Sequence, residues 1–419
     1  MKTYKAESFD KMQYLYGAAH DPLVHGVIRF SGRIDIAALN KAVTASLCAV
    51  PMLRCCFEMR AGSPRWVDRN FTGEDIVSVI DAETFDEAQI QRLLATTIDI
   101  FHEPQLKLLV MRTGAFDSLC VIMNHMVCDG AGLKEYLGLL AGLYTKCVRG
   151  EKMLPPVCGP RGTAQLFKRF GFFEKLKILF MNYDVSALKA QRPYRLEGDP
   201  DTPFFLSFKT RREELLQLKD AAKKQGVTIN DMVLCAYIRV LHRRVGGGRV
   251  VMPCPVDLRK YLQSAQSPGI CNLTSNYICD IAIREGDTAE QTLEQVAQQM
   301  RQQKDSVGCL KSMISMEMAF GAIPFFIMKS LFLKVFMIPV VSFTNLGVID
   351  KASLSFGDTD ITDAYLTGAV KRVPYFQISI STFDGCCTFC CNMFGTQGDR
   401  TAVTSFLAEL REELLSYTG

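Results

Sequence analysis

Apolar and polar positions in the first 150 residues alternate between a strand-like and a helix-like period. Short apolar runs predict three strands, at 25–32, 106–114 and 118–124. The last two of these strands are joined by a short polar turn, which is typical of a hairpin. Apolar side chains three and four positions apart predict two helices, one at 35–47 and one that carries Leu133, Leu137, Leu140 and Tyr144.

The same alternation begins again after residue 200. The predicted strands of this part are 204–209, 249–259, 273–283, 340–349 and a hairpin that starts at 377. The predicted helices are 211–224, 229–244, 288–306 and 401–417. Thr228 is a typical N-cap for the second of these helices, and the glycine run 246–248 ends it. Strands that alternate with helices in both parts predict a protein of the α/β class.

A proline-rich break at 155–160 separates the two parts. We therefore predict an N-terminal half at 1–160, a crossover segment at 161–200 and a C-terminal half at 201–419. Each half has the size of an ordinary domain, whereas 419 residues are too many for one core of ordinary size.

The crossover contains a basic and aromatic stretch, 161–195, that has two interpretations. Its apolar positions can form one helical stripe beside lysine and arginine side chains: Phe167, Phe170, Phe173 and Leu176. Such a stripe favours either peripheral contact with a membrane surface or a crossover helix whose apolar face packs on the second half. We prefer the crossover helix.

Composition and charge exclude several classes of protein. Hydrophobic residues make up 48% of the chain and charged residues 22%, which is typical of an ordered globular protein. The net charge of +4 predicts no nucleic-acid partner, which would require a strongly basic face. The longest uncharged apolar stretch, 335–349, is shorter than the roughly 18 residues that a transmembrane helix needs. Because the N-terminus lacks the apolar core of a secretory signal, we expect a cytoplasmic protein. We also expect the protein to be a monomer.

Sixteen cysteines raise the question of a metal or redox site. The densest group, GCCTFCCNMF at 385–394, follows an Asp-Gly pair that predicts a tight hairpin turn. On a strand, cysteines four positions apart share a face but lie about 13 Å from each other. Zinc–sulfur bonds of about 2.3 Å cannot bridge that distance. We therefore expect buried free thiols and no metal site.

One histidine stands in a distinctive motif. His125 opens the pattern H-x-x-x-D-G between a predicted strand and a predicted helix, with Asp129 and Gly130 at its end. The simpler interpretation makes Asp129 the N-cap of the helix and His125 an incidental residue at the strand end. The functional interpretation makes His125 a general base, because its ordinary pKa lies near neutral pH. The other four histidines lack such a motif, and we expect surface or structural roles for them: His20, His25, His102 and His242.

The segment HMVCDG resembles the active-site motif of the CoA-dependent acyltransferase superfamily. This superfamily includes chloramphenicol acetyltransferase, the condensation domains of nonribosomal peptide synthetases, wax ester synthases and alcohol acetyltransferases. Four further segments are similar to its motifs and occur in the family's order: VPMLRCCF at 50–57, GVTINDMVLCAYIRVL at 226–241, VDLRKY with GICNLTSNYI at 256–278, and SFTNLG at 342–347.

The resemblance implies two chloramphenicol-acetyltransferase-like halves in a pseudo-dimeric arrangement, with a tunnel between them. An acyl thioester enters from one side and a small-molecule acceptor from the other, and no cofactor is bound. The thioester is acyl-CoA or the phosphopantetheine arm of an acyl carrier protein. His125, midway along the tunnel, takes the proton of an acceptor hydroxyl or amine as it attacks the thioester.

The resemblance also assigns supporting residues. Asp129 is the second catalytic residue of the motif, but it points away from the reaction and pairs with an arginine. Arg54 and Arg259 are the two candidates for this arginine, and we prefer Arg259. Gly130 allows the backbone to turn tightly. The expected substrate-binding residues are Asn124, Ser342, Thr344 and Asn345.

The sequence departs from the family pattern at two points. Many members have two adjacent histidines, and this chain has Asn124 in the first place. The tryptophan-containing segment of wax ester synthases is not evident near the N-terminus, which disfavours long-chain esters. Because no carrier or adenylation module follows, we expect a free-standing acyltransferase that uses acyl-CoA and an alcohol or amine. The alternatives are a stand-alone condensation enzyme that uses a carrier-bound acyl group, and a non-catalytic relative of the same fold.

Overall fold

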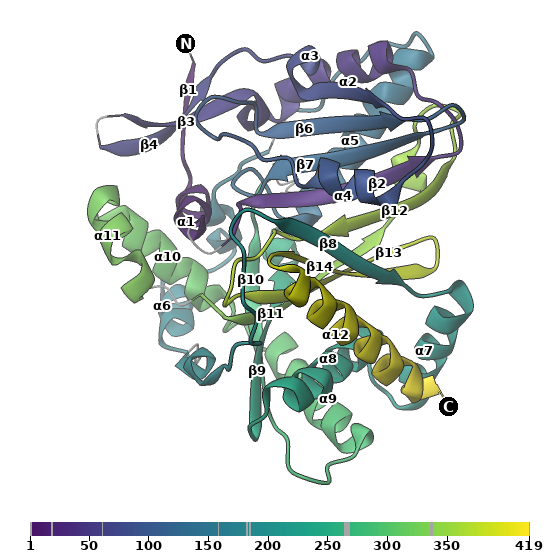
Figure 1. Cartoon of the computed structure of the whole chain (residues 1–419). Helices are drawn as coiled ribbons and strands as arrows, with labels where there is room; N and C mark the ends of the chain where they lie inside the picture. The colour runs from purple at the N-terminus through teal and green to yellow at the C-terminus, as the bar shows by residue number, and fades with distance from the viewer. Residues whose placement is uncertain are drawn as a thin grey trace.

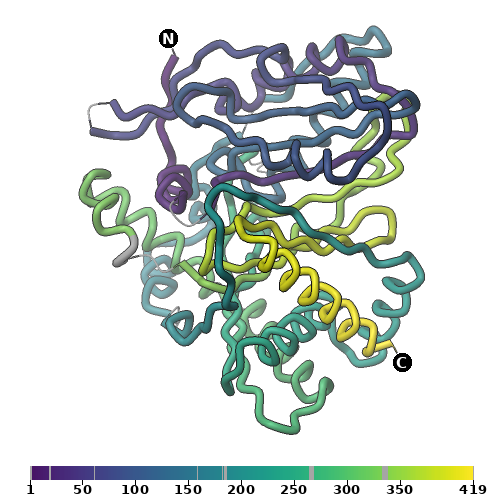
Figure 2. Tube along the Cα trace, in the orientation of Figure 1, coloured from purple at the N-terminus to yellow at the C-terminus, as the bar shows by residue number. Residues whose placement is uncertain are grey.

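The computed structural model has the mixed α/β architecture that the sequence predicts (Figure 1). It describes residues 2–17, 20–60, 62–157, 159–181, 183, 186–263, 269–335 and 338–418. In Figure 2 the N-terminus lies at the top of the molecule, and the C-terminus lies at the lower right.

A five-stranded sheet forms the upper part of Figure 1. Its strands, in spatial order, are β12 (Ile361–Thr367), β2 (Leu23–Phe30), β7 (Asp117–Asn124), β6 (Leu106–Arg112) and β5 (Val77–Asp81). Neighbours are antiparallel except for β5 and β6, which are parallel. The strand β12 belongs by sequence to the predicted second half, yet it pairs with β2 of the first. Backbone hydrogen bonds therefore join the two parts of the chain.

Helices cover both faces of this sheet. The helices α2 (Ile36–Ala49) and α5 (Gly130–Val148) pack on one face, and the short helix α3 (Gly73–Ile76) contacts α2. The opposite face receives α4 (Glu87–Leu94) together with strands of the second sheet. Because side chains alternate along β7, Val121 joins the first core and Ile122 the second. This sheet is therefore buried on both sides, and its strands are almost continuously apolar.

The second part of the chain contains a four-stranded sheet and a long two-stranded ribbon. The sheet order is β11 (Val341–Ile349), β13 (Phe376–Phe383), β14 (Cys386–Phe394) and β8 (Pro203–Lys209). The ribbon pairs β9 (Arg249–Asp257) with β10 (Thr274–Ala282), and the 3-10 helix η4 (Leu258–Tyr261) follows β9. The helices around them are α7 (Arg212–Lys224), α8 (Ile229–Val245), α9 (Ala289–Lys304) and α12 (Gln397–Leu415), and the chain also forms the 3-10 turns η5 (Ala352–Leu354) and η6 (Ser416–Thr418).

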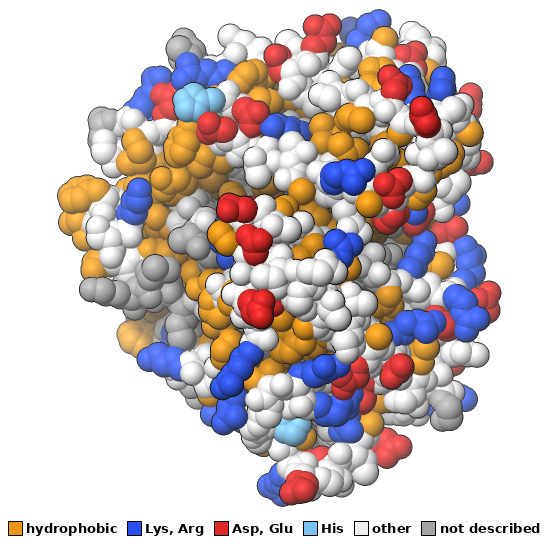
Figure 3. Space-filling view, in the orientation of Figure 1, with side chains coloured by type: hydrophobic (Ala, Val, Ile, Leu, Met, Phe, Trp, Pro, Cys, Tyr) orange, Lys and Arg blue, Asp and Glu red, His pale blue; other side chains and the backbone are white. Residues whose placement is uncertain are grey.

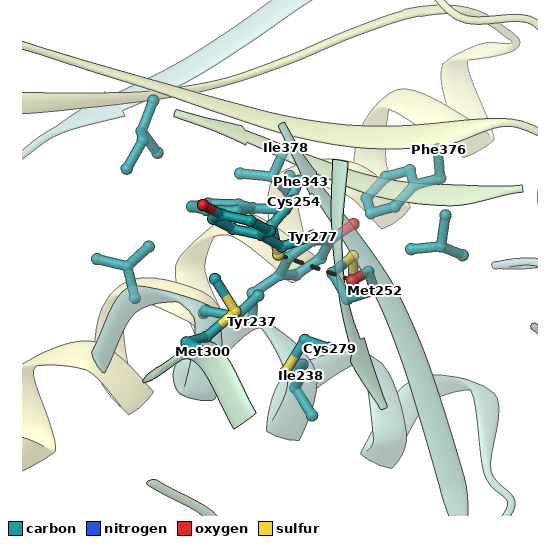
Figure 4. Close-up of a cluster of buried hydrophobic side chains, with 14 of the residues drawn as sticks. Tyr237, Ile238, Met252, Cys254, Tyr277, Cys279, Met300, Phe343, Phe376 and Ile378 are labelled. Carbon is teal, nitrogen blue, oxygen red and sulfur yellow. Dashed lines mark hydrogen bonds between the residues drawn. The ribbon is translucent and has the colours of Figure 1, made fainter. Parts of the chain in front are cut away.

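Side chains from the ribbon, the sheet and two helices meet in one core (Figure 4). Tyr237 of α8 packs against Phe343 of β11 and Phe376 of β13, with ring centroids 6.2 and 6.4 Å away. Met252 and Cys254 of β9 fill the space beside them. Burial of these large side chains stabilises each by about 1.5–3 kcal/mol relative to exposure.

The cysteine hairpin has the predicted form. Asp384 and Gly385 have φ of 43° and 77°, the left-handed values that a primed two-residue turn requires. Cys387, Cys390 and Cys391 of β14 are buried in the sheet, and all three are free thiols. Among the described residues, no group of three or more histidine, cysteine or acidic side chains is placed to hold a metal ion.

The crossover segment does not form the single helical stripe that we predicted from its sequence. It forms the 3-10 turns η2 (Thr163–Phe167) and η3 (Ser186–Ala190), with the helix α6 (Phe172–Phe180) between them. The predicted stripe is wrong because the helix starts only after Gly171, so Phe167 is buried in η2 while Phe173 is exposed on α6. Within α6 only Ile178 is buried.

Two further helices were not predicted, α10 (Leu310–Ala322) and α11 (Phe325–Val335). They lie beside α1 (Ser8–Tyr16) at the left of Figures 1 and 2. Figure 3 shows hydrophobic side chains gathered at this edge, where Phe326, Ile327 and Leu331 of α11 are exposed. No helix within the described ranges combines the length and the apolar character that crossing a membrane requires.

A buried ion pair fixes α1 to the rest of the molecule. A small sheet lies next to α1. Its strands, in spatial order, are β1 (Thr3–Lys5), β4 (Ser63–Asp68) and β3 (Cys55–Arg60), and the 3-10 turn η1 (Pro51–Arg54) directly precedes β3. The Asp10 carboxylate accepts hydrogen bonds from the indole of Trp66 at 2.7 Å and from both terminal nitrogens of Arg161 at 3.1 Å. The same guanidinium donates to the backbone carbonyls of Met126 and Val127. Asp10 therefore connects α1 to the residues that follow His125.

We predict that Asp10→Ala destabilises the protein by about 3–5 kcal/mol, because it leaves the buried Arg161 cation without its carboxylate. Urea unfolding followed by the fluorescence of Trp66, the single tryptophan, measures this loss. The exposed Asp220→Ala on α7 is the control and is expected to change stability by less than about 0.5 kcal/mol. Equal unfolding midpoints for the two variants would contradict the role given to Asp10.

Candidate active site

A cavity of about 670 Å³ lies where the two parts of the chain meet. Its wall combines residues of α1, of the turn between β7 and α5, of the β9–β10 ribbon, of α10 and of β11. The residues before and at the start of β13, from Gly368 to Gln377, complete it. Most of the wall is apolar, which is typical of a pocket for a small organic ligand.

His125 lies in this wall, directly after the last residue of β7. Its backbone N–H donates to the carbonyl of Pro22 at 2.7 Å, which continues the pairing of β7 with β2. His20 also lines the cavity, although we expected only a surface or structural role for it. The sequence therefore identified one of the two cavity histidines.

Asn272 determines which nitrogen of His125 carries the proton. Its amide nitrogen donates to the carbonyls of His125 at 2.8 Å and Met126 at 3.3 Å, which directs its oxygen toward the imidazole. That oxygen lies 3.1 Å from Nδ1 of His125. An amide oxygen only accepts hydrogen bonds, so Nδ1 carries the hydrogen and Nε2 keeps its lone pair. The arrangement leaves Nε2 as the basic nitrogen.

The surroundings of His125 favour the neutral imidazole. Burial lowers its pKa below the ordinary value of 6.5, and the positive charge of Lys371 acts in the same direction. The bond to its own backbone carbonyl, the charge of Asp129 and the contact with Asn272 oppose this shift. At neutral pH the side chain is therefore able to accept a proton.

Asp129 does not contact His125 and holds the turn beneath it. Its Oδ1 accepts from the N–H of Gly132 at 2.8 Å, as the N-cap of α5. Its Oδ2 accepts from the N–H of Leu273 at 2.7 Å and from Arg259 at 3.1 Å. The pairing with Arg259 agrees with our preferred candidate, although Arg259 lies in η4 and not on a strand.

Arg54, the other candidate, is not the partner of Asp129. Its guanidinium pairs with Asp68, the last residue of β4, at 2.9 Å. This pair and the neighbouring Tyr4 raise the pKa of Arg54 against the effect of burial.

The two glycines of the motif differ in importance. Gly130 is the first residue of α5 and does not have a left-handed φ, and a Cβ there would collide with the Leu346 side chain. A Cβ on Gly132 would lie 2.7 Å from the Cβ of Cys128 and 3.1 Å from the carbonyl of Cys271. Close approach of two backbone segments therefore requires Gly132, which we did not predict.

The expected substrate-binding residues divide into two groups. Ser342, Thr344 and Asn345 of β11 line the cavity, as expected. Asn124 does not: it is fully buried, and its amide donates to the Gln105 side chain at 2.6 Å and accepts from the Met126 N–H at 2.9 Å. Adjacent residues at the end of a strand point to opposite sides, so the neighbour of His125 faces away from the cavity.

Sequence comparison relates parts of the chain to two much longer synthetases. No family model matches it. A stretch of 236 residues is 25% identical to the nonribosomal peptide synthetase TES of Alternaria alternata and covers 53% of this chain but 4% of that protein. The chain therefore spans only a small part of the length of the curated relatives that it matches.

Solved structures share the fold over the whole chain. The trichothecene 15-O-acetyltransferase of Fusarium sporotrichioides has a TM-score of 0.73 at 13% identity, with 99% of this chain and 95% of that chain covered. The first condensation domain of the CDA synthetase has a TM-score of 0.72 at 15% identity, with 100% and 97% covered. The chloramphenicol-acetyltransferase-like fold that the motifs implied is thereby confirmed.

We predict that Asp129→Ala lowers the free energy of unfolding by about 3–5 kcal/mol, because it removes the N-cap of α5 and the most buried of the three carboxylates that pair with Arg259. In a double-mutant cycle, Asp129→Ala and Arg259→Ala should couple by about 0.5–3 kcal/mol. The matched control is Arg54→Ala, whose effect should add to that of Asp129→Ala within about 0.5 kcal/mol. Chemical denaturation of the three single and two double variants measures both couplings. Coupling of Asp129 to Arg54 and not to Arg259 would overturn this assignment.

Proposed function

We propose that the protein transfers an acyl group from a thioester to the hydroxyl or amine of a small acceptor, with His125 as the general base. The donor in this proposal is an acyl-CoA. The observation that carries the proposal is the placement of Nε2 of His125, whose tautomer is set by Asn272, in the wall of a cavity of about 670 Å³. Relatives of the same fold include an acetyltransferase and condensation domains.

The reaction proceeds in two steps. As the acceptor oxygen or nitrogen forms a bond to the thioester carbonyl carbon, its proton passes to Nε2 of His125, and the carbonyl oxygen becomes an oxyanion. The oxyanion then re-forms the carbonyl, the carbon–sulfur bond breaks, and the imidazolium returns the proton to the leaving thiolate. The hydroxyls of Ser342 and Thr344, which line the cavity, are available to donate hydrogen bonds to the substrates.

A carrier-protein donor is the second candidate. The curated relatives are the nonribosomal peptide synthetase TES and the cyclosporin synthetase simA, and the matching stretch is a small part of each protein. The two donors share the thioester and the pantetheine arm and differ in what lies beyond its phosphate. Comparison of kcat/KM for the same acyl group on CoA and on a carrier protein separates them, since recognition of a carrier protein raises kcat/KM for that donor alone.

We predict that His125→Ala lowers kcat by about 10²- to 10⁴-fold, the usual effect of removing a general base. The thermal midpoint should stay close to that of the wild type, because the cap and the ion pair of Asp129 do not involve the imidazole. The exposed His102→Ala is the control and should retain full turnover. Turnover within a few-fold of the wild type in His125→Ala would exclude the base role.

We predict that kcat/KM of the wild type falls as the pH falls through an apparent pKa below 6.5, because protonated His125 cannot accept a proton. Asn272→Asp places a carboxylate next to the Nδ1–H, which stabilises the imidazolium and raises that pKa. The acid limb of the profile should therefore move to higher pH in Asn272→Asp. A merely structural role of Asn272 would lower the rate without moving the limb, and this result would refute its positioning role.

A further inference from the structure

Lys371 is a cavity residue whose position is fixed by the backbone on two sides. It pairs as an isolated antiparallel bridge with His20 of the first part of the chain. Its N–H donates to the carbonyl of Asn392 at 2.9 Å, and its carbonyl accepts from the N–H of Phe394 at 2.8 Å. The side chain therefore lines the cavity from the junction of the two parts, in the same wall as His125.

Among the described residues, none accepts a hydrogen bond from the Lys371 ammonium, and no carboxylate lies within 4.0 Å of it. The other two cavity lysines differ in this respect. Lys311 donates to the carbonyl of Met181 at 2.8 Å, and Lys134 donates to that of Val348 at 3.3 Å. The negative charge of Asp21 acts on Lys371, but its carboxylate accepts instead from the N–H of Val370 at 2.8 Å. Lys371 is thus a cation that the described protein groups leave without a direct partner.

The electrostatic effects of Lys371 reach the reaction centre. Burial lowers its pKa to about 8, so most of it is still charged at pH 7. Its charge in turn lowers the pKa values of His20 and His125. A desolvated cation without a partner is unfavourable, and such groups in cavities commonly meet an anion of the ligand.

We propose that Lys371 binds a carboxylate carried by one of the two substrates, close to the carbon that reacts. This inference rests on the proposed acyl transfer for its site. The phosphates of the thioester donor cannot be this anion, because the long uncharged pantetheine arm separates them from the thioester. The carboxylate therefore belongs to the acceptor or to the acyl chain. When it binds, it offsets the charge of Lys371 and makes His125 more basic.

Binding of simple probes tests the carboxylate site without turnover. Isothermal titration at pH 7 compares octanoate with octanamide, which has the same length and no charge. The wild type should bind octanoate about 10- to 100-fold more tightly, the value of a hydrogen bond to a charged group. In Lys371→Met the two probes should bind equally within about twofold, whereas the control Lys311→Met should keep the preference. A wild type without the preference, or a Lys371→Met variant that keeps it, overturns the proposal.

Turnover then identifies which substrate carries the carboxylate. One arm compares a hydroxy acid with its primary amide as acceptors, and the other compares succinyl-CoA with butyryl-CoA as donors. Lys371→Met should abolish the preference for the charged member in one arm only. An equal loss of kcat for charged and neutral members in both arms would instead assign Lys371 to the oxyanion and would overturn the carboxylate site. Because octanoate binding needs no reaction, failure of acyl transfer itself would appear here and not in the titrations.

Discussion

The carboxylate of Asp129 is the constraint on which the candidate site depends. It accepts hydrogen bonds from the start of α5, from Leu273 and from Arg259, which lies 130 positions away in the sequence. These bonds hold the segment before β10 against the turn that follows β7. Asn272 lies in that segment, so its contact with His125 is a consequence of the same junction. In the proposed reaction Asp129 therefore acts by positioning the segments around His125.

Buried charged side chains surround this junction, and two of them, Asp129 and Lys371, act on the pKa of His125. Arg161 joins the turn to α1, whose side chains line the cavity, and it is itself paired with Asp10. Arg259 and Arg161 are both matched by carboxylates, whereas Lys371 faces the cavity without one among the described residues. A substrate anion would complete the balance of charge beside the imidazole. In this proposal Lys371 both selects a substrate that carries a carboxylate and affects the basicity of His125.

The local pattern of apolar and polar residues was sufficient to predict the strand and the helix that carry the site. It was not sufficient to predict which residues meet through long-range contacts. The strand before His125 and the helix capped by Asp129 follow from periodicity and from the cap, and both formed as predicted. The choice between Arg54 and Arg259 depends on a contact across 130 positions, which no local signal determines. Asn272 was missed for the same reason. The helix α10 was missed because its apolar residues show little one-sided periodicity, and α11 was missed because its sequence, FFIMKSLFLKV, is apolar almost throughout.

Mass spectrometry of reaction products tests the central claim most directly. The protein is incubated with mixed acyl thioesters of CoA and of pantetheine, and with alcohols and amines that include carboxylated members. The account predicts acylated acceptor and an equal amount of free thiol, with carboxylated substrates dominant among the products. Absence of any acylated acceptor, or release of thiol by hydrolysis alone, would contradict it.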